Sequence, residues 1–188
     1  MTMTTHASTA HGNSALLTAA INQFDELIRA VPTACAHEST PCPDYDITEL
    51  TAHVAVVIDR LAHALGAEHP DHDSAPDWTS ARDRAIAAIA VTAPGMPVSL
   101  PFGTMPAQIA YGVLLGELTT HAWDLAVAIR RTDLLDQSLG AAAATLVVAR
   151  IPEQPRDAMP FGPVVPIAFD APPYDRLAGW RAETPRGE

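Results

Sequence analysis

The chain has 188 residues and a mass of 19.9 kDa, which is the size of one domain with a sizeable buried core. Its 22 acidic residues outnumber its 11 basic residues, which are all arginine, so the formal net charge is −11. This excess of acidic residues, with no cluster of basic residues along the sequence, argues against nucleic acid and anionic membrane surfaces as partners. No apolar run approaches the roughly 20 residues that span a bilayer, so we expect no membrane insertion.

The N-terminal residues bear on the domain boundary and on the cellular compartment. Residues 1–13 lack helical periodicity and the features of a secretory signal. We therefore expect a disordered tail ahead of one domain over 14–188, and we expect the protein in the cytoplasm.

The two cysteines, Cys35 and Cys42, are too few for a disulfide scaffold and too widely spaced for a C-x-x-C site. We expect both to be reduced packing residues, although a functional thiol at either position stays open.

Apolar residues at steps of three and four predict five helical segments. In chain order they are 16–31 (closed by Pro32), 47–65, 79–92, 107–130 and 134–150. Asp46 and Glu49 match a capping box at the start of the second. The prolines of 94–106 surround a short extended piece, and PYDRLAGW (173–180) predicts a final turn of helix in a proline-rich C-terminal segment. The predicted fold class is all-α, a four-helix bundle with a short additional helix.

Histidines are numerous, and four of the eight follow a carboxylate by four residues, the spacing that puts two side chains on one helical face. The pairs are Glu49/His53, Asp59/His63, Glu68/His72 and Glu117/His121. Chance supplies about one such pair, so helical position has to separate them. Glu68 and His72 bracket a proline in a polar loop. Asp59/His63 projects away from the apolar arc of its helix, which predicts solvent exposure. His53 lies at the edge of that arc, either as a packing residue or as a ligand.

Glu117 and His121 lie one turn apart in the segment 107–130, which is apolar nearly all round and is therefore expected at the centre of the bundle. Such groups are costly in an apolar core unless they are paired or bound to a metal, and the residues alone leave both alternatives open. With His53 they would form a three-ligand site with an open position, suited to zinc, iron(II) or nickel(II). Asp124 is either an acceptor for an imidazole N–H or a surface or packing residue.

Three segments together are similar to a known family. They are TPCPDYDITELTAHV (40–54), PFGTMPAQIAYGVLLGELTTHAWDLAVAI (101–129) and DAPPYDRLAGW (170–180). The chain resembles short actinobacterial metal-binding proteins related to the N-terminal domain of mycothiol-dependent maleylpyruvate isomerase and, more broadly, to the DinB-like bundles. The resemblance implies a DinB-like four-helix bundle with one divalent metal ion, zinc foremost. It implies His53, Glu117 and His121 as the ligands.

The resemblance says less about activity. Relatives with known chemistry use the metal to ionise a small thiol such as mycothiol, so the first hypothesis is a transferase-like enzyme with a small-molecule thiol and an electrophile as partners. Isomerase activity is not implied, because the isomerase uses a separate C-terminal domain for which this chain is too short. The family's usual glycine after the ligand histidine is Ala122 here, and Asp44-Tyr45 follow the T-P-C-P turn, which alters helix packing and the pocket mouth.

Two other functions stay open at this stage. A non-catalytic metal-loaded binding or sensing protein is the main alternative, because no Ser/His/Asp or Cys/His arrangement is evident. Metal-assisted hydrolysis is the other, with Asp124 as the nearby candidate for a general base. A homodimer formed through an apolar face is also open.

Overall fold

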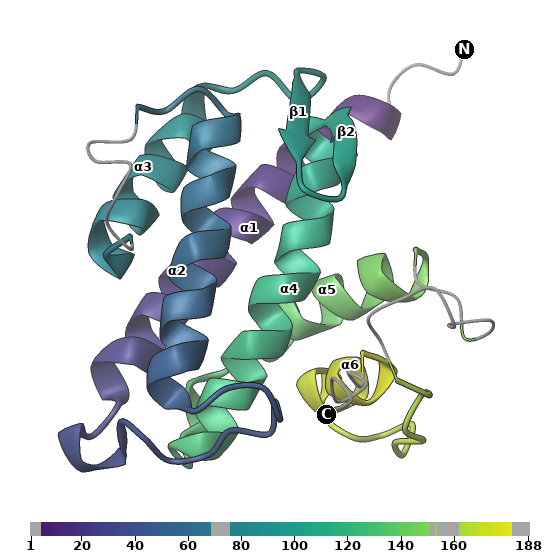
Figure 1. Ribbon diagram of the computed structural model, residues 1–188. Helices are drawn as coiled ribbons and strands as arrows, with labels where there is room; N and C mark the ends of the chain where they lie inside the picture. Colours follow the sequence, from purple (N-terminus) through teal and green to yellow (C-terminus); the bar gives the residue numbers. More distant parts are fainter. Residues whose placement is uncertain (1–4, 69–75, 151–152, 154–161, 182–188) are drawn as a thin grey trace.

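The computed structural model describes residues 5–68, 76–150, 153 and 162–181 (Figure 1). The helices within these ranges are α1 Thr5–Ala30, α2 Ile47–Ala64, α3 Trp78–Val91, α4 Ala107–Ala128, α5 Gln137–Val148 and α6 Pro173–Trp180, with 3₁₀ turns at Thr33–Cys35 and Thr132–Leu134. The strands β1 Pro97–Leu100 and β2 Gly103–Pro106 pair as an antiparallel hairpin. The predicted all-α fold class is confirmed.

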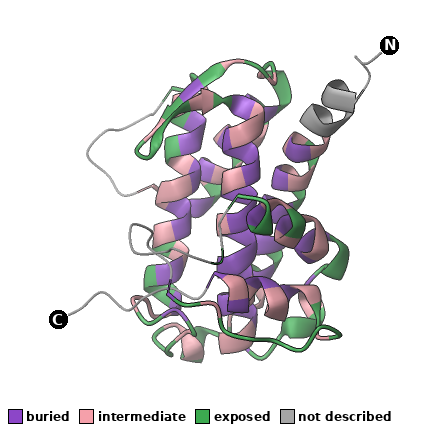
Figure 2. Ribbon diagram, turned by 90° about the vertical axis from the view of Figure 1, so that its right-hand side faces the viewer, coloured by how far each residue is buried: buried purple, intermediate pink, exposed green. Residues whose placement is uncertain are grey.

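The helix α4 is the centre of the molecule. It packs against α1 and α2, while α3 lies against α2 and α1, which makes the four-helix bundle. Helices α5 and α6 pack against α4 and against each other (Figure 1). Buried residues are concentrated where these helices face one another (Figure 2). Because α4 is enclosed in this way, its residues are buried on nearly all sides, as its apolar sequence predicts.

Local sequence signals account for the helix ends. The capping box of α2 is present: the Glu49 amide donates to Oδ1 of Asp46 at 2.8 Å, and the Asp46 amide donates to Oε2 of Glu49 at 2.9 Å. Asp77 and Asp136 cap α3 and α5 with their side chains. The capping box fixes where α2 begins and therefore the direction in which His53, two turns later, points.

The structure differs from the sequence-based expectation at the N-terminus. Helix α1 begins at Thr5, so residues 5–13, which we expected in a disordered tail, continue the helix, while residues 1–4 lie outside the described residues. The stripe that starts at Leu16 is the part of α1 that faces the bundle, and periodicity alone does not detect a helix that extends beyond it.

The expected exposure of Asp59 is wrong. Its side chain is mostly buried and forms an ion pair with Arg84 of α3. Helix α3 covers this side of α2, and a pattern read along α2 alone carries no information about that neighbour. His63, its partner at helical spacing, is exposed as expected, and His72 lies outside the described residues.

The extended piece expected within 94–106 is the β1–β2 hairpin. Leu100 pairs with Gly103 across the two-residue tip, Pro101-Phe102, and Gly103 adopts a φ of 135°, which glycine tolerates. The hairpin lies beside the N-terminal end of α4 (Figure 1). Throughout the described part of the chain, every helix is too short or too polar to cross a lipid bilayer.

Candidate metal centre

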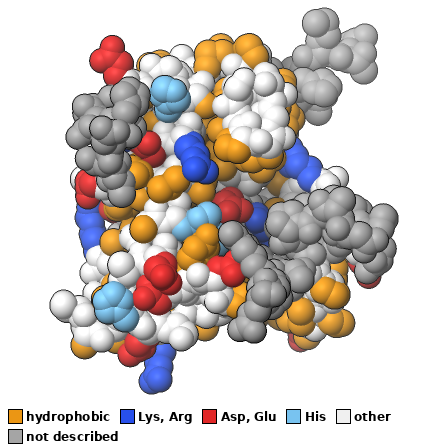
Figure 3. All heavy atoms as spheres, viewed as in Figure 1, with side chains coloured by type: hydrophobic (Ala, Val, Ile, Leu, Met, Phe, Trp, Pro, Cys, Tyr) orange, Lys and Arg blue, Asp and Glu red, His pale blue; other side chains and the backbone are white. Residues whose placement is uncertain are grey.

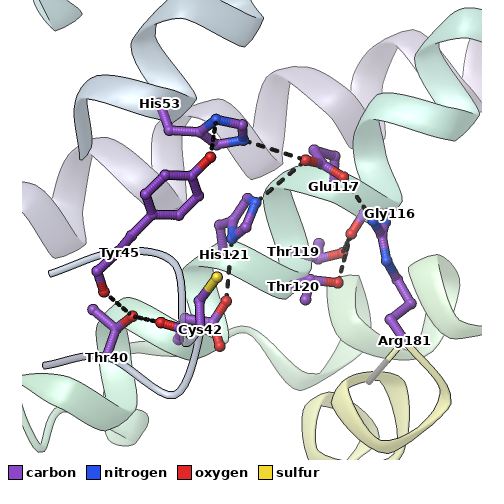
Figure 4. Close-up of polar contacts among 11 residues, drawn as sticks. Thr40, Cys42, Tyr45, His53, Gly116, Glu117, Thr119, Thr120, His121 and Arg181 are labelled. Atoms are coloured by element: carbon purple, nitrogen blue, oxygen red, sulfur yellow. Dashed lines mark hydrogen bonds and ion pairs between the residues drawn. The ribbon is translucent and has the colours of Figure 1, made fainter. Parts of the chain in front are cut away.

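Helices α2 and α4 bring together the three side chains that the sequence singled out. Donor atoms of His53, Glu117 and His121 lie within 4.8 Å of one another. Nε2 of His121 is 3.2 Å from Oε1 of Glu117, and Nε2 of His53 is 3.5 Å from the same oxygen (Figure 4). Two imidazole nitrogens from different helices therefore converge on one carboxylate oxygen, an arrangement of donors that suits a divalent metal ion.

The opposite nitrogen of each ring has its own partner. Nδ1 of His121 lies 3.1 Å from Oδ2 of Asp124, and Nδ1 of His53 lies 3.2 Å from the hydroxyl of Tyr45, whose ring also stacks on that imidazole. Asp124 is therefore placed to accept a hydrogen bond from Nδ1–H of His121. When Nδ1–H donates to these oxygens, each Nε2 carries the lone pair that a metal requires.

Glu117 is held from its other side by Arg181, which follows α6. Nη2 of Arg181 donates to Oε2 of Glu117 at 2.6 Å, and the arginine side chain is only 5% exposed. A Cβ on Gly116 would lie 3.0 Å from Nη1 of Arg181 and 2.7 Å from Cγ2 of Val147. Glycine at this position therefore lets Arg181 and α5 approach α4 closely.

These contacts shift two pKa values in opposite directions. Burial alone would raise the pKa of Glu117, but hydrogen bonds from His121 and His53 and the charge of Arg181 hold it well below its usual range. Burial would lower the pKa of His121, but its hydrogen bonds to Asp124 and Glu117 and their charges raise it to about 9. Without a metal ion, both shifts favour an ion pair between the Glu117 carboxylate and a protonated His121.

Two residues of this centre escaped the sequence analysis as contributors, namely Tyr45 and Arg181. Tyr45 stands directly before the capping residue of α2, so the turn that starts the helix also places the phenol over His53. Arg181 adjoins the segment 170–180 that carries the family resemblance. The available signal for it was the need of a buried carboxylate for a cationic partner.

Among the described residues, the centre is exposed to solvent at His53 and Glu117 and closed at His121. The side chains of His53 and Glu117 are 27% and 25% exposed, whereas that of His121 is 2% exposed. In the face shown in Figure 3, histidine, acidic and basic side chains lie close together near the middle, with hydrophobic atoms beside them. A small molecule can therefore approach from the side of His53 and Glu117, while His121 forms the buried end of the centre.

The T-P-C-P turn lines a cavity that also contacts Asp124. Cys42 is buried and lines this cavity with Thr120 and Asp124, whereas Cys35 is half-buried elsewhere. Neither cysteine forms a disulfide bond within the described part of the chain, as expected.

Comparison with known proteins identifies the family. The model of the mycothiol maleylpyruvate isomerase N-terminal domain matches residues 17–77. Two uncharacterized proteins of Mycobacterium tuberculosis, from strains CDC 1551 / Oshkosh and ATCC 25618 / H37Rv, are each 32% identical over 156 residues, covering 78% of this chain and 84% of theirs. The chain belongs to the family of the mycothiol maleylpyruvate isomerase N-terminal domain. No solved structure matches it.

Membership in the mycothiol maleylpyruvate isomerase N-terminal domain family agrees with the DinB-like bundle observed here and with the expected actinobacterial relatives. The family match ends at residue 77 and so includes His53 on α2, while Glu117 and His121 on α4 lie beyond it.

Proposed function

We propose that this protein binds one divalent metal ion, zinc foremost, through His53, Glu117 and His121, and uses it to activate a low-molecular-weight thiol of the mycothiol type for transfer to an electrophile. The observation that carries the proposal is the convergence of both Nε2 atoms on Oε1 of Glu117. Three protein ligands leave a coordination position open, as is usual in catalytic rather than structural sites.

The donor set fits such an ion. Two imidazoles and one carboxylate are ordinary ligands of zinc, and their outer partners Asp124 and Tyr45 fix the rings in the orientation that a metal needs. The chemistry that a divalent ion supplies when bound is a lower pKa for a coordinating thiol, which then reacts as its anion.

The remaining tasks fall to the protein. The apolar surroundings of the centre exclude water from His121, and Arg181 keeps Oε2 of Glu117 occupied so that Oε1 faces the histidines. Asp124 already accepts from His121, which argues against its service as the general base of a hydrolase. Thiol activation needs no such base, and for this reason we favour it over hydrolysis.

A matched pair of variants on α2 tests metal binding. His53→Gln removes a ligand, while His63→Gln makes the same change at an exposed position of the same helix. Elemental mass spectrometry of untagged protein should find one divalent ion per chain in the parent and in His63→Gln, and loss of the ion in His53→Gln. Equal metal content in both variants, or none in the parent after addition of zinc, nickel or iron, would refute the site.

Thiol activation needs its own measurement. Mycothiol should shift the visible absorption of the Co(II)-substituted protein, because a sulfur ligand changes the ligand field. Turnover of a thiol and electrophile pair that disappears in His121→Ala would exclude the alternative of a non-catalytic binding or sensing protein. A metal-loaded protein whose spectrum ignores mycothiol would favour that alternative.

A further inference from the structure

A largely apolar cavity adjoins the metal centre on the side of α5 and the hairpin tip. Its volume is about 440 Å³, within the range of roughly 300–1,000 Å³ typical of small-molecule sites. Most of its lining residues are apolar, among them Val57, Leu100, Phe102, Val113, Leu114 and Val147. Glu117 belongs to both the cavity wall and the metal centre, so a molecule in the cavity lies against the centre.

The charges that line this cavity are mainly positive. Arg60, Arg150 and Arg181 all belong to its wall, and Glu117 is the carboxylate among the lining residues. Arg181 is hydrogen-bonded to that carboxylate. In a chain with a formal net charge of −11, three arginines around one cavity mark a local reversal of charge.

Two of these arginines form no ion pair with a carboxylate among the described residues. Arg60 is exposed and has no carboxylate partner within 4.0 Å among the described residues. Arg150 donates from Nη1 to the backbone oxygen of Leu146 at 3.1 Å. This bond leaves the charge of Arg150 without an anionic partner among the residues that the structure describes. Both guanidinium groups therefore suit an anion brought by a ligand.

The surface of α4 is shaped to accept the guanidinium groups. Gly112 and Gly116 lie one turn apart, and a Cβ on Gly112 would meet Nη2 of Arg150 at 3.3 Å, just as one on Gly116 would meet Nη1 of Arg181 at 3.0 Å. Each glycine leaves space for one guanidinium against the helix. The packing thus directs two long basic side chains, one just after the end of α5 and one just after the end of α6, toward the same cavity.

We propose that this cavity binds an organic anion with an apolar body, whose carboxylate or sulfonate pairs with Arg60 and Arg150 while the body lies against α4 and the hairpin tip. Its assignment as the electrophilic partner of the activated thiol rests on the proposed function. The binding itself rests on the cavity and its arginines. Phe102, 56% exposed at the tip of the hairpin, covers the apolar body from the solvent side.

The test compares two probes of the same shape, 6-phenylhexanoate and 6-phenylhexan-1-ol, by isothermal titration calorimetry with the full-length protein. The anion should bind roughly tenfold more tightly than the alcohol, the effect of about two partly exposed ion pairs. Arg60→Met with Arg150→Met should abolish this preference and leave the affinity for the alcohol unchanged, which also shows that the cavity is intact. Each single variant should lose part of the preference.

The control removes the same charge elsewhere. Arg29→Met with Arg131→Met changes two arginines that bond to Asp25 and Asp133 and do not line the cavity, so the preference should remain. Equal binding of both probes to the parent, or loss of the preference in this control, would overturn the proposal.

The metal-site variant separates this inference from the proposed function. In His53→Gln, the preference for the anion should persist, because the arginines and not a metal ion receive the carboxylate. If the preference disappears in His53→Gln and survives in the double arginine variant, the anion binds to the metal and the inference fails while the metal site stands. If His53→Gln retains metal and the preference remains, the proposed metal site fails and the anion site stands.

Discussion

Arg181 donates a 2.6 Å hydrogen bond to Oε2 of Glu117, although the two residues are 64 positions apart in the chain. The two oxygens of this carboxylate therefore have different partners: Oε2 faces the arginine, and Oε1 faces the two imidazoles. The residue that ends the last helix of the described chain therefore helps to orient Glu117 in the central helix.

The hydrogen bond between Asp124 and His121 should strengthen metal binding. Asp124→Ala removes the oxygen that fixes the imidazole, so we expect the affinity for zinc to fall about 10–100-fold, as found when outer partners of metal ligands are removed. Competition with a chelator measures this. Asp83→Ala, at an exposed position of α3, is the control and should bind zinc like the parent. Unchanged affinity in Asp124→Ala would contradict the assigned role.

Close packing at Gly116 should make this position intolerant of a side chain. A Cβ there would lie 2.7 Å from Val147, so Gly116→Ala should lower the free energy of unfolding by about 1–3 kcal/mol. Gly12→Ala is the matched control, because that glycine is also helical and its Cβ would meet nothing within 4 Å. The control should be neutral or slightly stabilising, by up to about 1 kcal/mol. Urea unfolding of the three proteins gives the comparison, and a Gly116→Ala variant as stable as the parent would contradict it.

The metal-free protein should lose stability as the pH rises through weakly alkaline values. Despite its burial, His121 has a folded-state pKa raised to about 9 from 6.5 by Asp124 and Glu117. A raised pKa means that the stabilisation is complete below pH 6.5 and is lost by about pH 9, with a total of about 3 kcal/mol at about 1.4 kcal/mol per pKa unit.

Urea unfolding in a chelator at several pH values measures this dependence. His121→Gln has no proton to lose at this position, so its stability should vary much less across the same window. A parent protein whose stability stays level from pH 6.5 to 9 would show that the ring is neutral in the metal-free fold.

The two thiols should differ in reactivity. Cys42 is buried, whereas Cys35 is half-buried, so a thiol reagent such as 5,5′-dithiobis(2-nitrobenzoate) should label Cys35 first. A hydrogen bond with Glu38 raises the pKa of Cys35, which should make it slower than a free thiol at neutral pH. Cys35→Ser should remove the faster phase and leave Cys42 to react on unfolding. Rapid labelling of Cys35→Ser would show that the Cys42 side chain is accessible.

The parts of the site that the sequence predicts are those set by helix geometry. Glu117 and His121 share a face because they are four residues apart on one helix, and the capping box of α2 is equally local. The buried position of α4 followed from its apolar composition. That His53 meets the other two depends on how α2 packs on α4, and this part came from the family resemblance.

The parts that the sequence did not predict depend on contacts between distant segments. Arg181 reaches Glu117 only because α6 docks against α4 and α5, a packing that leaves no periodic signal near Glu117. Asp59 was expected in solvent because its own helix places it off the apolar arc, but Arg84 approaches it from α3. In both cases the partner is an arginine, whose long side chain extends beyond the helix that carries it.

The order of these residues along the chain has a consequence for biosynthesis. A ribosome adds Arg181 64 positions after Glu117, which at about 5–20 residues per second takes roughly 3–13 s. During that interval the nascent chain already contains His53, Glu117 and His121, while Oε2 of Glu117 has not yet acquired its guanidinium partner. If the proposed metal site is correct, an ion captured during translation would meet a carboxylate with both oxygens available, whereas an ion captured after release would meet only Oε1.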